Sequence, residues 1–461
     1  MNSWKLGAIV VFTVAGLAAA YVTHIPLVVG FSGGLLVLSL TVMRDLGIGT
    51  RRLFSMMAEG VAHTKEVVWI LLLVGLLIPS WTASGTIAFL VDAGLRLLYP
   101  EFLLTFGFLF AAGFALTLGT STGTLSAVGI PLMGVAAHIG VPLPMMAGAL
   151  LSGAFVGDRT SPFSSAHRLV ASSAGVPAAS LFRILLPTSC AAFVLSSLLY
   201  GILDWVGDWG TGAIALSGGR SGFVLHPLLA IPPVLLLLAN VFRLQTKYAF
   251  IAAIVSALAL GFALQAGDWR DWIVWLWEGY TASASSEGAA GIGGKGVVDM
   301  IDLVALIALA GAYNGILEKT NLIMPIARRL LGGESATLAS MTARAGLFGF
   351  GLGVVSCTQT LPIMMTSRNL AGVWTERYSN EHLARVTADT SLLFAALVPW
   401  NMLAILCGTI VGVPAEQYAL YAFFVWLPPL LTYGWSVWLG RRSGAAAAGV
   451  QTGARNRAAG T

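Results

Sequence analysis

Long apolar runs, separated by short polar segments, follow one another along almost the whole chain. They fall near residues 6–22, 25–43, 67–83, 102–118, 120–139, 142–166, 180–205, 227–242, 248–265, 299–317, 335–352, 354–370, 385–407 and 417–440. Runs of about 16–25 apolar residues suit helices that cross the roughly 30 Å hydrocarbon core of a bilayer, and they are too continuous for the alternating strands of a β-barrel. The pattern predicts an all-α polytopic membrane protein with about 12–14 transmembrane helices, several of them broken or re-entrant.

Composition agrees with a membrane-embedded chain, because 57% of the residues are hydrophobic and 10% are charged, against about 25% charged in soluble domains. The net charge of +5 comes from short clusters of lysine and arginine, and no basic stripe of the kind that binds nucleic acid is visible. Cys190, Cys357 and Cys407 lie far apart in apolar segments, so they predict neither a disulfide framework nor a metal site.

The distribution of charge predicts how the chain is oriented. With a cytoplasmic N-terminus, the clusters that fall inside are Arg44, Arg51, Arg52, Lys65, Arg168, Arg183, Arg243, Lys247, Arg328, Arg329, Arg368, Arg377, Arg441 and Arg442. Loops 207–225 and 266–298 fall outside, and most of their charged residues are acidic. Cytoplasmic loops are enriched in lysine and arginine, so we expect a bacterial inner membrane protein with both termini in the cytoplasm. The first apolar run reads as a retained span, since a second follows it at once.

The order of the runs divides the chain into five parts. Residues 1–66 hold two spans and a predicted interfacial helix, and residues 207–298 hold linking spans and loops. Residues 67–206 and 299–440 each hold a similar series of runs, but the first series begins inside and the second outside. Such an inverted-topology repeat is typical of secondary transporters, whose sites lie at broken helices near the bilayer midplane. The tail, residues 441–461, is small, polar and basic, and it is predicted to be disordered.

The first motif, "GDRTSPFSSAH" (157–167), ends an uncharged apolar run. Gly157 and Pro162 predict a helix break, and an uncompensated charge such as Asp158 is costly inside a membrane. Freed carbonyl groups and the side chains of Asp158, Thr160, Ser161 and Ser164 would offer hard oxygen ligands for a small cation. The alternative is a cytoplasmic loop with a proline turn.

The second motif is "ADTSLLFAALVPWN" (388–401). Asp389 and Thr390 precede an apolar run that ends at Pro399, where we expect a second break, and Asn401 offers a further oxygen. The alternative is a capped helix start followed by a proline kink.

Hydroxyl side chains gather in two further segments, "GTSTGTLS" (119–126) and "SCTQT" (356–360). Their matching places in the two repeats predict that Thr120, Thr122 and Thr358 line the site. The alternative is that these hydroxyl groups join helices to each other.

Enzymatic signals in the sequence are thin. No HExxH motif occurs, and "GAAGIGGKG" lacks the Ser or Thr that follows the lysine of a phosphate-binding loop. We therefore expect no enzyme activity and no cofactor.

These motifs resemble those of the NhaC family of sodium/proton antiporters, within the ion-transporter superfamily. "GDRTSPFSSAHR" is similar to the family pattern GD(K/R)xSPLSDTTN, and "ADTSLLFAALVPWN" is similar to EDxGTxxxxLVPWN. "LIPSWTASGTI" and "GILEKTNLI" resemble its GTWxASGT and GxLExxG segments, so the likeness covers roughly residues 60–440. The matching positions are Asp158, Ser161, Pro162, Asp389, Pro399, Trp400 and Asn401.

The chain departs from the family pattern after the first motif. Ser165 stands where the family has an aspartate, and Ala166, His167 and Arg168 replace its TTN. If that aspartate helps to hold sodium, Ser165→Asp is expected to raise the sodium affinity.

The resemblance implies a secondary transporter that exchanges a cation for protons by alternating access. Asp158 and Asp389 would bind the transported Na⁺ or H⁺ in turn, and the only other partner expected is the lipid bilayer, with a homodimer as one assembly to test. The alternatives are coupled transport of a small organic acid or amino acid, a channel, and a membrane scaffold without transport. Saturation and counterflow would separate a carrier from a channel.

Overall fold

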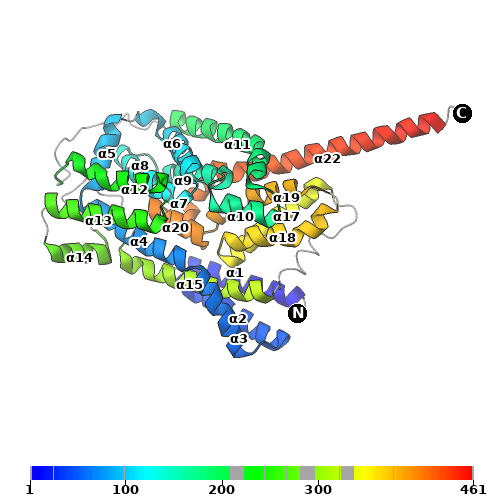
Figure 1. Ribbon diagram of the computed structural model, residues 1–461, viewed down its shortest axis with the longest axis horizontal. Helices are drawn as coiled ribbons and strands as arrows, with labels where there is room; N and C mark the ends of the chain where they lie inside the picture. Colours follow the sequence, from blue (N-terminus) through cyan, green and yellow to red (C-terminus); the bar gives the residue numbers. More distant parts are fainter. Residues whose placement is uncertain are drawn as a thin grey trace.

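The computed structural model describes residues 3–23, 25–97, 99–207, 223–242, 244–265, 268–280, 296–320, 322, 337–376 and 378–458. Every regular element in these ranges is helical (Figure 1). Seven of the described helices are long and apolar enough to cross a membrane, or up to eight when the pair Met402–Val411 and Ala415–Tyr421, bent by 82°, is taken as one span. The all-α polytopic fold is therefore confirmed. The total of about 12–14 crossings stays a prediction, because shorter apolar helices and broken helices add to the long ones.

The N-terminal part and the first predicted repeat follow each other directly. The N-terminal helices are α1 Ser3–Val22, α2 Leu27–Leu46 and α3 Thr50–His63. The first predicted repeat holds α4 Lys65–Ala83, α5 Thr86–Leu97, η1 Pro100–Phe102, α6 Leu103–Leu118, α7 Ser121–Thr124, the π-helical η2 Leu125–Gly129, α8 Ile130–Ile139, α9 Leu143–Thr160, α10 Ser165–Ala174 and α11 Ala178–Val206.

The linking part and the second predicted repeat complete the chain. The linking elements are η3 Pro227–Ala230, α12 Ile231–Val241, α13 Thr246–Leu264 and α14 Trp269–Glu278. Then come α15 Val297–Thr320, α17 Leu338–Ser356, α18 Thr360–Thr375, α19 Asn380–Thr387, the π-helical η4 Ala388–Leu392, η5 Phe394–Ala396, α20 Met402–Val411, α21 Ala415–Tyr418, η6 Ala419–Tyr421 and α22 Phe423–Ala458.

Two segments are more helical than the sequence predicted. Helix α14 lies within the expected polar loop, where Asp268 and Asp271 form a reciprocal capping box at its start. The helical backbone of α22 continues through residues 441–458, where we expected a disordered tail; its alanine-rich sequence has a high helix propensity. Most of the two loops predicted to lie outside, and Arg243, Arg328, Arg329 and Arg377, fall outside the described residues.

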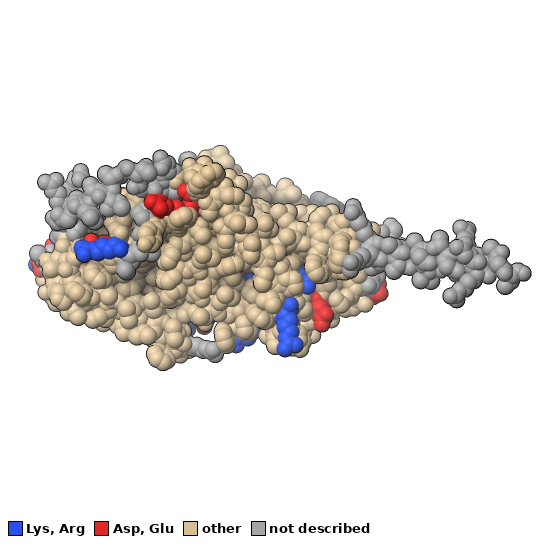
Figure 2. Space-filling view, turned by 90° about the horizontal axis from the view of Figure 1, so that it is seen from above, with Lys and Arg blue, Asp and Glu red and all other residues tan. Residues whose placement is uncertain are grey.

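The surface and the packing both suit a lipid environment. Figure 2 shows a face on which charged residues are few, and large apolar side chains such as Phe12, Leu198 and Phe262 are more than half exposed. Lipid accounts for such exposure, which water would penalise. Charged side chains pair where they are partly exposed: Glu59 Oε2 on α3 lies 2.6 Å from Lys319 Nζ on α15, and hydrogen bonding to that lysine lowers the pKa of Glu59.

Candidate functional site

Helix α9 continues further into the first motif than the sequence predicted. It runs through Gly157 and ends at Thr160, so the expected break at Gly157 is wrong. A Cβ atom at Gly157 would lie 2.1 Å from the carbonyl carbon of Ala115 on α6. The glycine is therefore needed for the close approach of two helices, not for a turn. The chain leaves the helix at residues 161–164, around Pro162.

Asp158 lies in the last turn of α9, and its side chain is buried among hydroxyl groups. Ser164 Oγ donates to Oδ1 at 2.9 Å, and Ser121 Oγ donates to Oδ2 at 3.0 Å. Ser121 begins α7, whereas Ser164 is the N-cap of α10 and also accepts from the backbone N–H groups of Ala166 and His167. The break thus places two hydroxyl groups from different helices on one carboxylate. No lysine or arginine forms an ion pair with Asp158 within the described ranges.

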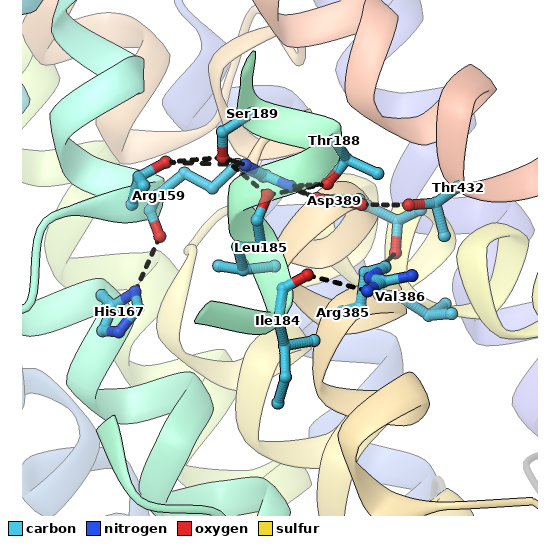
Figure 3. A network of polar contacts seen from close by, with 12 residues as sticks. Arg159, His167, Ile184, Leu185, Thr188, Ser189, Arg385, Val386, Asp389 and Thr432 are labelled. Atoms are coloured by element: carbon cyan, nitrogen blue, oxygen red, sulfur yellow. Dashed lines mark hydrogen bonds and ion pairs between the residues drawn. The ribbon is translucent and has the colours of Figure 1, made fainter. Parts of the chain in front are cut away.

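Asp389 has a different environment, because it forms an ion pair with Arg159 (Figure 3). Arg159 Nε donates to Asp389 Oδ1 at 2.6 Å, and both side chains are fully buried. Thr432 on α22 donates its hydroxyl to the other carboxylate oxygen, Oδ2. A buried carboxylate with an arginine and a hydroxyl partner is compensated for the loss of water.

The guanidinium group of Arg159 also reaches hydroxyl groups on α11. Its Nη2 donates to Thr188 Oγ1 at 2.8 Å, and its Nη1 donates to Ser189 Oγ. Thr160 Oγ1 lies 3.1 Å from Ser189 Oγ, so the predicted site residue Thr160 belongs to this arginine network. Consecutive helical residues point about 100° apart, which explains why Asp158 and Arg159 enter separate environments.

The residues that replace the family's DTTN pattern lie away from both carboxylates. Ser165 is exposed, and so is Arg168, whose Nη2 donates to the carbonyl of Phe163 at 2.8 Å. His167 is buried, with Nδ1 2.8 Å from the carbonyl oxygen of Arg159 and Nε2 3.1 Å from that of Ala178. The histidine therefore joins the end of α9 to the start of α11.

A side chain in the first broken segment satisfies a carbonyl group at the end of the helix packed beside it. Ser161 donates its hydroxyl to the carbonyl of Leu116 on α6 at 2.8 Å. The last carbonyl groups of a helix have no partner within it, so this bond holds the break against α6.

Two side chains in the second broken segment likewise satisfy carbonyl groups at the end of α17. Trp400 Nε1 donates to the carbonyl of Val354 at 2.9 Å, and Asn401 Nδ2 donates to that of Gly353 at 3.3 Å. Pro399 lies in this segment, between η5 and α20. Its neighbour Asn401 also caps α20 by accepting from the N–H of Leu403, so Asn401 has a structural position and is not beside Asp158 or Asp389 in the hydrogen-bond network.

Three other predicted residues serve local helix geometry. Thr120 is the N-cap of α7 and accepts from Gly123 N at 2.9 Å. The backbone carbonyl of Thr122 accepts from Ser126 Oγ, and Thr390 Oγ1 donates to the carbonyl of Val386 at 2.6 Å. These contacts place Thr120 and Thr122 in the segment that carries Ser121, and Thr390 in the π-helical segment that carries Asp389.

Thr358 lies in a different place from the two aspartates. It lines a cavity of about 270 Å³ together with Asn314, Glu318 and His63, and its Oγ1 is 3.5 Å from Asn314 Nδ2. The hydroxyl clusters at matching places in the sequence therefore do not converge on one site. In the described part of the chain, no three His, Cys, Asp or Glu side chains are grouped as metal ligands.

Four hydroxyl groups around Asp158 and the Arg159–Asp389 pair are not predicted by the sequence motifs. Ser121, which contacts Asp158, lies between the predicted site residues Thr120 and Thr122. Thr188 and Ser189, which contact Arg159, and Thr432, which contacts Asp389, occur as a pair or singly in apolar helices. A signal was present for the helical ones, because each follows a proline within the same helix: Pro187 in α11, and Pro428 and Pro429 in α22.

Comparison with known proteins matches residues 185–438 to the model of the Na⁺/H⁺ antiporter family. The Na⁺/H⁺ antiporter NhaC of Alkalihalophilus pseudofirmus is 25% identical over 415 residues, which cover 89% of this chain and 88% of that protein. The malate-2H⁺/Na⁺-lactate antiporter of Bacillus subtilis is 24% identical over 85% of each chain. The arginine/ornithine antiporter ArcD of Halobacterium salinarum is 25% identical over 84% of this chain and 82% of its own.

Proposed function

The chain belongs to the Na⁺/H⁺ antiporter family, and from this premise we propose that it exchanges sodium ions for protons across the membrane, with Asp158 as the exchange site. It is a multi-pass membrane transporter and not an enzyme. Its cargo would be Na⁺ and H⁺, and it would need no cofactor.

The observation that carries the proposal is the contrast between the two buried aspartates. Asp389 is paired with Arg159, whereas the partners of Asp158 are the hydroxyl groups of Ser121 and Ser164. A sodium ion prefers hard oxygen ligands, which the Asp158 carboxylate and the Ser121 hydroxyl supply. The Ser121 hydroxyl can rotate and turn its lone pairs toward a cation, whereas Ser164 Oγ already accepts from the N–H groups of Ala166 and His167.

Exchange follows from competition at one carboxylate. A protonated Asp158 is neutral and leaves no charge for sodium to neutralise, whereas bound sodium disfavours protonation of the same group. An empty, ionised Asp158 would be an uncompensated charge inside the membrane, which is costly. The site therefore favours states that hold either H⁺ or Na⁺, and this coupling makes the exchange obligatory.

The two broken segments support the inverted repeat and alternating access. Ser161 holds the break after α9 against α6, and Trp400 and Asn401 hold the break before α20 against α17. Asp158 lies in the last turn of α9, just before the first break, whereas Asp389 lies on η4, with η5 between it and the second break. We propose residues 67–206 and 299–440 as the two units that move relative to each other, since transporters of this kind bind at such interrupted helices.

The remaining features of the assignment follow from charge and family. The asymmetry of arginine and lysine supports cytoplasmic termini and a location in a bacterial inner membrane, and a homodimer remains to be tested. Organic solutes are a second candidate cargo, since the names of two relatives include lactate, malate, arginine and ornithine.

The test is exchange in proteoliposomes, with an imposed sodium gradient and a pH-sensitive dye inside. Asp158→Asn should reduce sodium-dependent proton movement by at least about 100-fold, because a 1.4 kcal/mol change is already tenfold and a whole charge is removed. Asp158→Glu should keep measurable exchange. Asp92→Asn, at an exposed carboxylate paired with Arg96 on α5, is the matched control and should exchange like the parent protein. Parent rates in well-folded Asp158→Asn would refute the assignment.

A further inference from the structure

The cavity of about 270 Å³ around Thr358 lies between α3, α4, α15, α18 and α20, and neither Asp158 nor Asp389 lines it. A water molecule takes up about 30 Å³ of the liquid. The cavity therefore has room for a monovalent cation that keeps its first shell of water, in contrast to the close hydroxyl groups around Asp158.

Glu318 supplies a negative charge to this cavity. It is half-buried in the last turn of α15. Within the described ranges, no lysine or arginine forms an ion pair with its carboxylate and no donor hydrogen-bonds to it. The neighbouring Lys319 is paired with Glu59, at 2.6 Å, and the other ionisable side chain of the lining, His63, is exposed. A cleft that carries one negative charge concentrates cations.

Thr358 supplies a neutral oxygen to the same cavity. The contacts of its Oγ1 with Asn314 Nδ2 and Ser356 Oγ are both long, at 3.5 Å, so the hydroxyl group can rotate and offer a lone pair to a cation. Asn314 Nδ2 donates instead to the carbonyl of Ser356 at 2.9 Å. Residues four apart share one face of a helix, so this bond holds Thr358 at the face of α15 that carries Glu318.

Helix α20 connects the cavity with the region of Asp158. Its residues Leu403 and Leu406 line the cavity. The same helix packs against α7, which begins with Ser121, the hydroxyl partner of Asp158. A cation in the cavity is therefore one helix away from the segment that holds the proposed exchange site.

We propose that this cavity is a second cation site, which holds a hydrated monovalent cation near Glu318 and Thr358. Because the ion keeps its water, the site should bind sodium and potassium alike. Binding at this site does not depend on exchange at Asp158. Its consequence does rest on the proposed function: the site raises the concentration of sodium beside α20 and so speeds the arrival of sodium at Asp158.

The first test is binding of radioactive sodium to the purified full-length protein in detergent, with choline chloride keeping the ionic strength constant. The parent should show a tight and a weak class of sites. Glu318→Gln should remove the weak class, Asp158→Asn should remove the tight class, and potassium should compete for the weak class. Glu66→Gln removes an equal charge from an exposed position on α4 that does not line the cavity, so it should bind sodium like the parent.

The second test does not require a Glu318 variant to fold. Thr358→Cys is made in a Cys190→Ser background, because Cys190 is the exposed cysteine. A cationic thiol reagent should label this cysteine faster than an anionic reagent of similar size, and potassium should slow that labelling more than choline does.

In exchange assays, Glu318→Gln should raise the sodium concentration for half-maximal rate by about threefold or more and keep the maximal rate, as expected for lost electrostatic attraction. The proposal is overturned if folded Glu318→Gln keeps the weak class of sites, or if both thiol reagents label Thr358→Cys equally. Parent exchange in Asp158→Asn would refute the exchange site and leave the weak class intact, so the two failures are distinguishable.

Discussion

Arg159 and Asp389 are 230 positions apart in the sequence, yet their side chains form a fully buried ion pair. Arg159 lies on α9 and Asp389 on η4, so the pair joins the two predicted repeats. The hydroxyl groups that complete it come from the long helix of each repeat, Thr188 and Ser189 on α11 and Thr432 on α22. The pair therefore joins the two halves in the conformation that the structure shows.

Removing one charge of this pair should destabilise the protein more than removing both. Arg159→Gln leaves Asp389 buried and uncompensated, which should lower the free energy of unfolding by roughly 3–5 kcal/mol. The double variant Arg159→Gln/Asp389→Asn should recover most of that loss, because two neutral amides remain. Thermal unfolding of the parent protein and the two variants in detergent measures the effect.

The same double variant also tests which aspartate binds the cation. If exchange takes place at Asp158, the double variant should keep sodium-dependent proton movement within about tenfold of the parent, as expected when a structural pair is replaced by neutral groups. Complete loss of exchange in a folded double variant would mean that Asp389 itself binds the cargo.

Ser121→Ala should weaken sodium binding without unfolding the protein. The variant removes one hydroxyl group from Asp158, and a hydrogen bond to a charged group contributes about 1.5–3 kcal/mol. We therefore expect the sodium concentration for half-maximal exchange to rise by about tenfold or more. Ser126→Ala is the control, because that buried hydroxyl donates to the carbonyl of Thr122 and not to Asp158. Equal shifts in both variants would contradict a specific role for Ser121.

Gly157→Ala should separate α6 from α9. Its added Cβ atom would lie 2.1 Å from the carbonyl carbon of Ala115, and backbone cannot yield as a flexible side chain does. Overpacking of this kind costs about 1–3 kcal/mol, which should appear as a lower melting temperature and a weaker exchange activity. Gly113→Ala on α6 meets nothing within 4 Å and should be neutral or slightly stabilising. An unchanged melting temperature for Gly157→Ala would show that the helices adjust.

Ser165→Asp should change the sodium affinity little, in contrast to what the family pattern suggested. Ser165 is exposed at the start of α10, while Ser164 makes the contact with Asp158. A carboxylate in the first turn of a helix is stabilised by about 0.3–1 kcal/mol, so the thermal stability should rise slightly. The half-maximal sodium concentration should stay within about twofold, as befits a solvent-screened charge. A tenfold fall in that concentration would restore the original expectation.

The position of Asp158 could be predicted because its signals are local. A proline such as Pro162 breaks a helix in an apolar run, and the carboxylate four residues before it stands out against an uncharged segment. Gly157 shows the limit of such reasoning, since glycine serves both turns and close helix contacts. The residue type alone does not distinguish a turn from a close helix contact. The contact is with Ala115, which is 42 positions away in the sequence.

The partner of Asp389 could not be predicted, because it depends on how distant helices pack. Arg159 is adjacent to Asp158 in sequence, but helical geometry turns it toward α11 and η4. Thr358 illustrates the reverse case: its hydroxyl-rich segment matched the one around Thr120, yet it lines the cavity with Asn314 and Glu318. Helix α14 did carry a local sign, the paired aspartates Asp268 and Asp271, which was outweighed by the glycine and serine around it.

The hydroxyl-lined position of Asp158 has an electrical consequence. An elementary charge that crosses a potential of 100 mV exchanges about 2.3 kcal/mol with the field. Under the proposed exchange, Asp158 is neutral with either cargo, and one Na⁺ moves one way for each H⁺ that moves the other way. Each cycle then carries no net charge across the membrane, so the membrane voltage neither drives nor opposes it. Clamping the potential with potassium and valinomycin should leave the exchange rate unchanged, and the chemical gradients of sodium and protons alone should set its direction.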